Sequence, residues 1–230
     1  EEDKIQKIKN ELDRYINIIA PTLPNHHVFY EDKEDKSTIK NLQQMFTYDD
    51  YFKQLIEESK IQELASSILG EKAIAKNLQY FNKPAGVGKP TPPHQDGYYF
   101  MLKKHNAVTC WLALEKVDEE NGCIHYVKGS HLHEEYRPHG RSEILGFSQG
   151  VTDFGTENDK LNTVSFPGEA GTFLIHNAKT IHWAEGNKSQ TRTRKALGFI
   201  YYGESAEEDK EAHDAYQLKL RKELEEKNLI

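Results

Sequence analysis

The first residues that could do chemistry are His94 and Asp96 in the stretch TPPHQDGYYF. Side chains two residues apart on an extended strand project to the same face, so this imidazole and this carboxylate can reach one ion. An ordinary hydrogen-bonded pair on a surface strand has the same spacing. A third ligand decides between the two interpretations, because iron(II) in oxygenases is commonly held by two histidines and one carboxylate, which leaves coordination positions open.

The third ligand is expected in the stretch GTFLIHNAKTIHWAEGNKSQTRTRKALGFIYY, where His182 follows a predicted strand. Arg192 and Arg194 lie at or near the start of the next strand. A guanidinium binds a carboxylate in a bidentate manner, such as the far carboxylate of a dicarboxylate whose keto-acid end chelates iron. His176 is a second candidate ligand, but the run FLIHN favours a structural or pocket role for it.

Helices are expected at both ends of the chain and strands in the middle. Apolar residues recur at helical spacing from Ile5 to Ile19, before Pro21, and again over residues 48–70. From residue 73 to 203 short apolar runs alternate with turn signals such as Asn-Gly and Pro-Gly. A charged helix over about 206–228, with a solvated face, ends the chain.

We therefore predict a single domain, 1–230, that is mainly β with flanking α-helices. Its parts are a mainly helical segment over 1–72, a β core over 73–203 and a C-terminal helical segment over 204–230. Many short strands in one domain of this size are typical of a sandwich or barrel. The sequence gives no signal for an oligomeric state.

Composition argues against several classes of partner. The net charge is −7 and no run of Lys and Arg offers a footprint for a phosphate backbone, so no nucleic-acid partner is expected. No apolar run approaches the roughly 20 residues of a membrane span, and the charged start EEDKIQKIKNE lacks the apolar region of a signal peptide. We expect a cytoplasmic protein that binds no membrane. Cys110 and Cys123 sit in apolar stretches without metal-type spacing and are predicted to be buried thiols.

Three blocks in order carry a resemblance to a known family. They are HQD with its following aromatics, CWLALEKVDEENGCIHYVKGSH, and GTFLIHNAKTIHWAEGNKS followed by RKAL. Over approximately residues 75–203 the chain resembles the phytanoyl-CoA dioxygenase family of iron(II)/2-oxoglutarate oxygenases. The resemblance implies a double-stranded β-helix, the cupin-like jelly roll.

The resemblance also implies residue roles. It places His94, Asp96 and His182 on the iron(II) ligands and Arg194 on the C5 carboxylate of 2-oxoglutarate, with Arg192 as its competitor. The pocket of this cosubstrate would include Trp111, Gln79 and Asn82. One departure is Ala184, which stands where many relatives have a serine that bonds the cosubstrate.

The implied reaction is hydroxylation of an unactivated C–H bond with O2, accompanied by release of succinate and CO2. Asp96 favours oxygenation over halogenation, because related halogenases carry a small residue in its place.

The substrate is expected to be a small, polar molecule. Residues 131–162 are predicted to form a long loop of the kind that often serves as a lid or binding loop, and Arg137, His139 and Arg141 in it suit an anionic group. A solvated loop with scattered charges is the alternative. An acyl-CoA would favour a broader basic surface than this acidic chain offers. Further substrate-binding candidates flank the predicted ligands or lie on a nearby strand, namely Tyr98, His125 and Trp183.

Three other functions are compatible with part of these sequence features. They are an oxygenase that modifies nucleic acid or protein, a noncatalytic metal- or sugar-binding jelly roll, and an oxidase that isomerises or closes a ring. Retained 2-oxoglutarate binding separates an enzyme from the noncatalytic protein.

Overall fold

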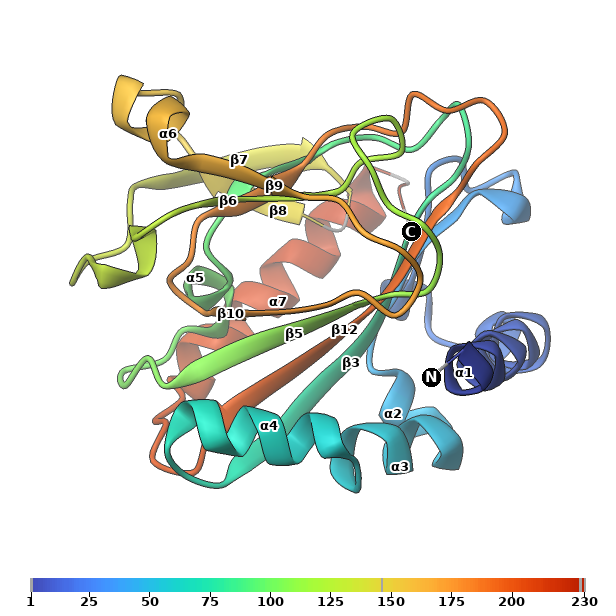
Figure 1. The fold of residues 1–230 in the computed structure, drawn as a ribbon, viewed down its shortest axis with the longest axis horizontal. Coiled ribbons are helices and arrows are strands. Elements are labelled where there is room, and N and C mark those ends of the chain that lie inside the picture. The colour runs from blue at the N-terminus through green and yellow to red at the C-terminus, as the bar shows by residue number, and fades with distance from the viewer. Residues whose placement is uncertain (1, 146, 228, 230) are drawn as a thin grey trace.

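Two antiparallel sheets lie one above the other in the computed structural model, which describes residues 2–145, 147–227 and 229 (Figure 1). The larger sheet has the order β1 (Val28–Tyr30), β2 (Ile39–Leu42), β3 (Ala73–Lys83), β12 (Arg194–Gly203), β5 (Ala107–Ala113) and β10 (Phe173–Asn177). The smaller sheet has the order β4 (Thr91–His94), β11 (His182–Ala184), β6 (Ile124–Val127) and β9 (Thr163–Phe166). Sequence positions far apart therefore face each other across the space between the sheets.

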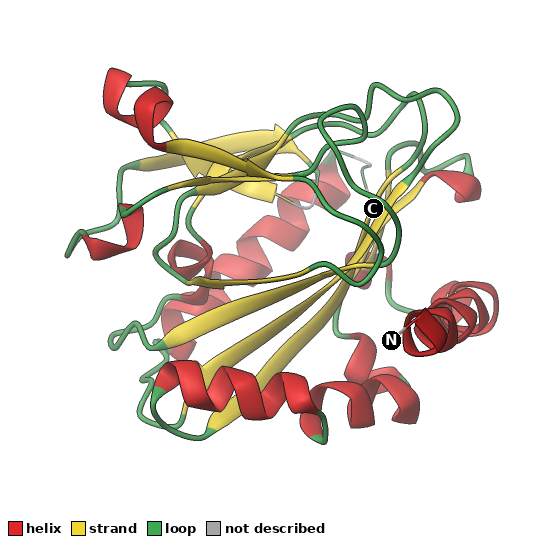
Figure 2. Cartoon of the chain, viewed as in Figure 1, coloured by secondary structure: helices red, strands yellow, loops and turns green. Residues whose placement is uncertain are grey.

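Helices cover the outer face of the larger sheet (Figure 2). The N-terminal helix α1 (Glu2–Arg14) continues through η1 (Tyr15–Ile19), a π-helical turn, and η2 (Ala20–Thr22). The helix predicted over 48–70 is divided in the structure into α3 (Asp50–Glu57) and α4 (Lys60–Leu69), preceded by α2 (Met45–Tyr48). The division occurs because Ser59 is extended and its Oγ accepts a hydrogen bond from Ile61 N, which starts a new helix.

Alternation over residues 78–83 of β3 and along β12 gives the larger sheet two different faces. Leu78 and Tyr80 of β3 and Phe199 and Tyr201 of β12 are fully or almost fully buried against the helices. Burial of side chains of this size contributes about 1.5–3 kcal/mol each. The residues next to them in sequence, among them Gln79 and Gly198, consequently face the space between the sheets.

The segment predicted as a long loop contains regular structure, so that expectation was wrong. It holds the hairpin β7 (His139–Ile144) and β8 (Phe147–Val151) and the helix α6 (Glu157–Asn162); residue 146 lies outside the described residues. Arg137 fixes the segment through ion pairs of 2.9 Å to Asp153 and 2.7 Å to Asp159. The polar strands of this hairpin lack the apolar alternation that would have marked them in the sequence.

The C-terminal helix α7 (Lys210–Glu226) crosses behind both sheets in Figure 1. None of its described residues is buried, which agrees with the expected solvated helix; the last predicted position, 228, lies outside the described residues. Arg141 of the hairpin pairs with Glu223 of this helix at 2.5 Å. No helix in the described part of the chain is long and apolar enough to span a membrane. The remaining short helices are η3 (Asn25–His27), η4 (Lys36–Thr38), α5 (Asp96–Phe100) and η5 (Ser130–Leu132).

Candidate metal and cosubstrate site

Strand pairing brings the two predicted histidine ligands together. His94 is the last residue of β4 and lies directly opposite His182 of β11 in the antiparallel ladder. Asp96 was predicted to lie on the same strand as His94, but in the structure it begins the short helix α5. Gln95 between them is extended, with φ −123° and ψ 119°, so His94 and Asp96 still turn toward the same point. One ligand atom from each of the three residues lies within 4.8 Å of the others.

Backbone carbonyls orient both histidines. The Nδ1 atom of His94 lies 2.8 Å from the carbonyl oxygen of Pro92, and that of His182 lies 3.0 Å from the carbonyl oxygen of Thr180. Because a carbonyl only accepts, each Nδ1 carries the hydrogen and each Nε2 presents a lone pair. These Nε2 atoms lie 3.4 Å and 3.6 Å from Oδ1 of Asp96. Three donor atoms therefore converge.

The other carboxylate oxygen of Asp96 is held by its neighbours. Thr109 Oγ1 donates to Oδ2 at 2.6 Å, and Nε2 of His176 lies 3.1 Å from the same oxygen. The Tyr126 hydroxyl in turn contacts His176 Nδ1 at 2.8 Å. We use the term metal-type cluster for His94, Asp96 and His182. His176 thus lies beside this cluster and helps to orient Asp96.

Electrostatics favour the protonation states that a metal requires. Burial opposes ionisation of Asp96, but the nearby His182 and the hydrogen bond from His176 outweigh it and hold the pKa of Asp96 well below its usual range. Burial, together with His94 and His176, lowers the pKa of His182 well below its usual value. An ionised carboxylate and a neutral imidazole are the ligand forms that bind iron(II).

One cavity of about 320 Å³ contains this cluster and runs along the inner face of β12. Strand register orders its wall, because Gly198 of β12 lies opposite Trp111 and Ile200 lies opposite Thr109. Arg194 begins the same strand, six residues before Ile200, which corresponds to about 20 Å of extended chain. The cavity therefore has an arginine end and a far end, with the metal-type cluster between them. Described residues at the arginine end are Arg194, Trp111, Gln79, Phe81, Thr91 and Ala184.

Arg194 is a buried cation that forms no ion pair with a carboxylate of the described residues. It is 4% exposed, its guanidinium carbon lies 5.7 Å from the ring centroid of Trp111, and Nε lacks a hydrogen-bond partner among the described residues. Burial lowers the pKa of Arg194 to about 10, so it stays charged at neutral pH. The Glu115 carboxylate favours this charge from a distance without forming an ion pair with it. A buried charge without a direct partner is costly, and the site is suited to a ligand that brings a carboxylate.

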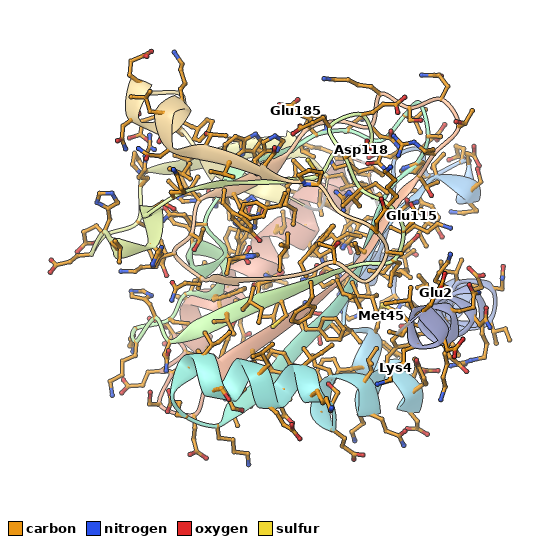
Figure 3. All side chains as sticks on the ribbon, viewed as in Figure 1. Glu2, Lys4, Met45, Glu115, Asp118 and Glu185 are labelled. Atoms are coloured by element: carbon orange, nitrogen blue, oxygen red, sulfur yellow. The ribbon has the colours of Figure 1, made fainter. Side chains whose placement is uncertain are left out.

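Arg192, the competing arginine, is already paired. Its two terminal nitrogens lie 2.9 Å from the two carboxylate oxygens of Asp118, and Glu120 lies 2.5 Å away. Figure 3 shows Asp118 close to Glu115, whose carboxylate accepts hydrogen bonds from Thr193 and from Lys195 N. These acidic groups hold the loop before β12 in place and leave Arg194 as the arginine of the cavity. The donor set thus fits iron(II), and Arg194 fits a dicarboxylate such as 2-oxoglutarate.

Comparison with known proteins agrees with this chemistry. The family model described as phytanoyl-CoA dioxygenase (PhyH) matches residues 1–196. The chain belongs to the phytanoyl-CoA dioxygenase family. It is 31% identical to the peroxisomal phytanoyl-CoA dioxygenase of Bos taurus over 135 residues, which cover 56% of this chain and 39% of the relative. It is 25% identical to a probable alpha-ketoglutarate-dependent hypophosphite dioxygenase of Stutzerimonas stutzeri, over 79% of this chain and 64% of the relative.

Solved structures confirm the predicted jelly roll for this member of the phytanoyl-CoA dioxygenase family. The alpha-ketoglutarate-dependent carbocyclase SnoK from nogalamycin biosynthesis superposes with a TM-score of 0.69 at 22% identity, covering 90% of this chain and 77% of the neighbour. EctD from S. alaskensis superposes with a TM-score of 0.70 at 15% identity, covering 87% and 68%. The chain spans about two fifths of the length of the first curated relatives it matches.

The remaining predicted site residues of this family member fall into two groups. Gln79, Trp111 and Trp183 line the cavity. Asn82 does not join the described cavity wall; its amide instead donates to the Ile39 carbonyl at 2.8 Å.

Tyr98, His125 and Arg141, predicted to contact substrate, also lie outside the described wall of the cavity. The Tyr98 ring stacks on His139 with centroids 4.1 Å apart, and the His125 ring stacks on Trp183 at 5.2 Å. Arg141 is partly exposed and points to α7, where Glu223 neutralises it.

Several wall residues were missed in the sequence. Thr109 could have been found, because it lies two residues before Trp111 on the same strand and therefore on the same face. No local pattern marks the residues of the far end, which are separated widely along the chain. The polar ones are Gln43, Gln44, Lys76, Asn77, Glu208, His213 and Gln217.

Proposed function

We propose that this chain is an iron(II)- and 2-oxoglutarate-dependent dioxygenase that hydroxylates an unactivated C–H bond of a small, polar metabolite. One observation carries the proposal: His94, Asp96 and His182 converge in the same cavity as Arg194, a buried cation that no carboxylate in the described part of the chain pairs with directly. A metal-binding jelly roll without catalysis has no use for such an arginine beside an open-sided cluster.

The residues of the chain have distinct tasks in this proposal. His94, Asp96 and His182 would hold iron(II), and Arg194 would hold the far carboxylate of 2-oxoglutarate beside Trp111 and Gln79. When bound, iron(II) and 2-oxoglutarate supply oxidation of the C–H bond by O2 with release of succinate and CO2.

The surrounding wall would assist these groups. Thr109 and His176 keep the carboxylate of Asp96 turned toward the metal position through its other oxygen. Aromatic residues of the wall, such as Trp111 and Phe81, exclude water from the cosubstrate end.

Size and polarity of the cavity support a small substrate. Its volume of about 320 Å³ lies at the lower end of ordinary ligand pockets, and it must also admit 2-oxoglutarate. Its far end is lined mainly by amide and charged side chains. Relatives and neighbours include proteins named for a fatty acyl-CoA, for hypophosphite and for ectoine chemistry, and the polar lining argues for the small-molecule end of that range.

Anaerobic titration of the metal-free protein with Fe(II) and then 2-oxoglutarate tests the proposal. A visible metal-to-ligand charge-transfer band is expected when the keto acid chelates the iron, and Asp96→Ala should abolish it. Folded, iron-loaded protein that never develops the band would remove the assignment. Product analysis then separates hydroxylation from epimerisation or ring closure, the chemistries named for two structural neighbours.

A further inference from the structure

The far end of the cavity contains an ion pair that the proposed chemistry does not use. Lys76 of β3 and Glu208, which directly precedes the N-cap of α7, contact each other through Nζ and a carboxylate oxygen. Both side chains are largely buried, at 33% and 25% exposed, and both line the cavity. Neither belongs to the metal or cosubstrate group of residues.

A β-bulge turns Lys76 into the cavity. On β12, Ile200 lies opposite Asn77 and the next residue, Tyr201, lies opposite Ala75, so Lys76 is the extra residue of β3. With regular alternation Lys76 would face the helices together with Leu78 and Tyr80. The bulge instead places two consecutive polar side chains, Lys76 and Asn77, on the cavity side. Bulges of this kind re-aim side chains next to active sites.

An aromatic ring lies beside the cation of this ion pair. The Lys76 ammonium lies 5.0 Å from the ring centroid of Tyr202, and Tyr99 and Phe100 also line the cavity. Ring faces of this kind attract a ligand cation as well as a lysine. The far end therefore offers one cation and one carboxylate in contact, with the Tyr202 ring beside the cation.

We infer that the substrate is a small zwitterion, with a cationic nitrogen and a carboxylate close together as in an amino acid. The inference rests on the proposed function and names its substrate class. A substrate with a carboxylate alone would engage Lys76 and leave Glu208 half-buried without a cation, and a simple amine would do the reverse. Leaving one member of such a pair uncompensated is costly, whereas a zwitterion satisfies both members.

Succinate release by the protein loaded with Fe(II) and 2-oxoglutarate tests the inference. The probes are the standard L-amino acids and glycine betaine, with pyrrolidine and cyclopentanecarboxylate as the matched amine and acid of L-proline. At least one zwitterion should raise succinate release severalfold above the uncoupled rate, and the matched amine and acid should not. Stimulation by the singly charged probes, or by none of the zwitterions, would overturn the inference.

Variants of the pair supply the second test, because loss of one charged partner should raise KM for the zwitterion roughly tenfold to a hundredfold. Lys76→Met and Glu208→Gln should both do so, and Lys76→Arg should restore part of the loss. Lys104 and Glu207 form a matched control pair at 2.8 Å that is exposed, at 62% and 57%, and lies outside the described cavity wall. Lys104→Met and Glu207→Gln should leave KM unchanged.

Two outcomes separate failure of the inference from failure of the proposed function. If Lys76→Met and Glu208→Gln lower the melting temperature but leave KM unchanged, the ion pair only anchors the start of α7 and the inference is wrong. If the wild-type protein lacks the anaerobic charge-transfer band, the proposed function itself fails.

Discussion

Replacement of Arg194 by Met should separate cosubstrate binding from folding. Met keeps most of the volume of the side chain but removes a guanidinium that is 4% exposed. Breaking a buried, hydrogen-bonded charge pair costs about 3–5 kcal/mol, which corresponds to at least about a hundredfold weaker binding of 2-oxoglutarate. Because no carboxylate among the described residues forms an ion pair with this charge, the same change should leave the melting temperature equal or higher.

Anaerobic titration of the charge-transfer band measures the affinity, and thermal unfolding measures the stability. Arg192→Met is the matched control, because Arg192 is paired with Asp118 and Glu120 and lies outside the described cavity wall. This replacement should leave the affinity for 2-oxoglutarate unchanged. Pyruvate, which lacks the far carboxylate, should bind wild type and Arg194→Met alike. If Arg194→Met binds 2-oxoglutarate with wild-type affinity, the argument from the buried cation is wrong.

The pH dependence and three further perturbations follow from the same geometry. Burial lowers the pKa of Arg194 only to about 10, so the guanidinium stays charged below that pH. Its contribution to 2-oxoglutarate affinity should therefore stay constant from neutral pH to about 9 and fall as pH rises through 10. Titrations in which the affinity already falls near neutral pH would contradict this. Thr109→Val removes the 2.6 Å hydrogen bond to Asp96 and should weaken Fe(II) binding by about 10- to 100-fold, as measured by anaerobic Fe(II) titration, whereas an unchanged affinity would show that Thr109 does not orient the ligand. Gly198→Ala places a Cβ 2.7 Å from a ring carbon of Phe81 and should cost about 1–3 kcal/mol, seen as lost stability in denaturant unfolding or as weaker 2-oxoglutarate binding; a variant unchanged in both would mean that the Phe81 ring moves freely. Protein in free Fe(II) at about a hundred times its Kd should melt about 5–10 °C higher than the same protein after a chelator has removed the Fe(II). An unchanged melting curve would argue against a metal that binds only the native state.

Local sequence patterns predicted the metal-type cluster because its members lie in short, ordered motifs. His94 and Asp96 are two residues apart, and His182 lies in a run that resembles the family over consecutive positions. The pairing of His94 with His182 across β4 and β11 was not predictable in the same way, because β4 contains two prolines and β11 has only three residues. Register between such short strands depends on the whole double sheet.

The far end of the cavity was not predictable for a different reason. Lys76 points into the cavity because it is the unpaired bulge residue of β3. The bulge is set by pairing with β12 rather than by the sequence of β3 itself. His213 and Gln217 lie on a helix whose residues are all partly or fully exposed, so its composition alone predicted only a solvated helix. Contacts of this kind depend on where the helix docks.

The walls of the cavity come from different parts of the fold, and this affects which of them can change during evolution. The metal-type cluster and the arginine end are built by strands of the two sheets, together with Asp96 at the start of α5. The register of these strands fixes the positions of their side chains together. At the far end, Gln43 and Gln44 precede α2, and His213 and Gln217 lie on α7, outside both sheets. Insertions or replacements in those two segments can alter which molecule is accepted without shifting a single strand pairing. The metal-type cluster and Arg194 thus depend on strand pairing, whereas part of the far wall lies on segments that can be exchanged independently of the sheets.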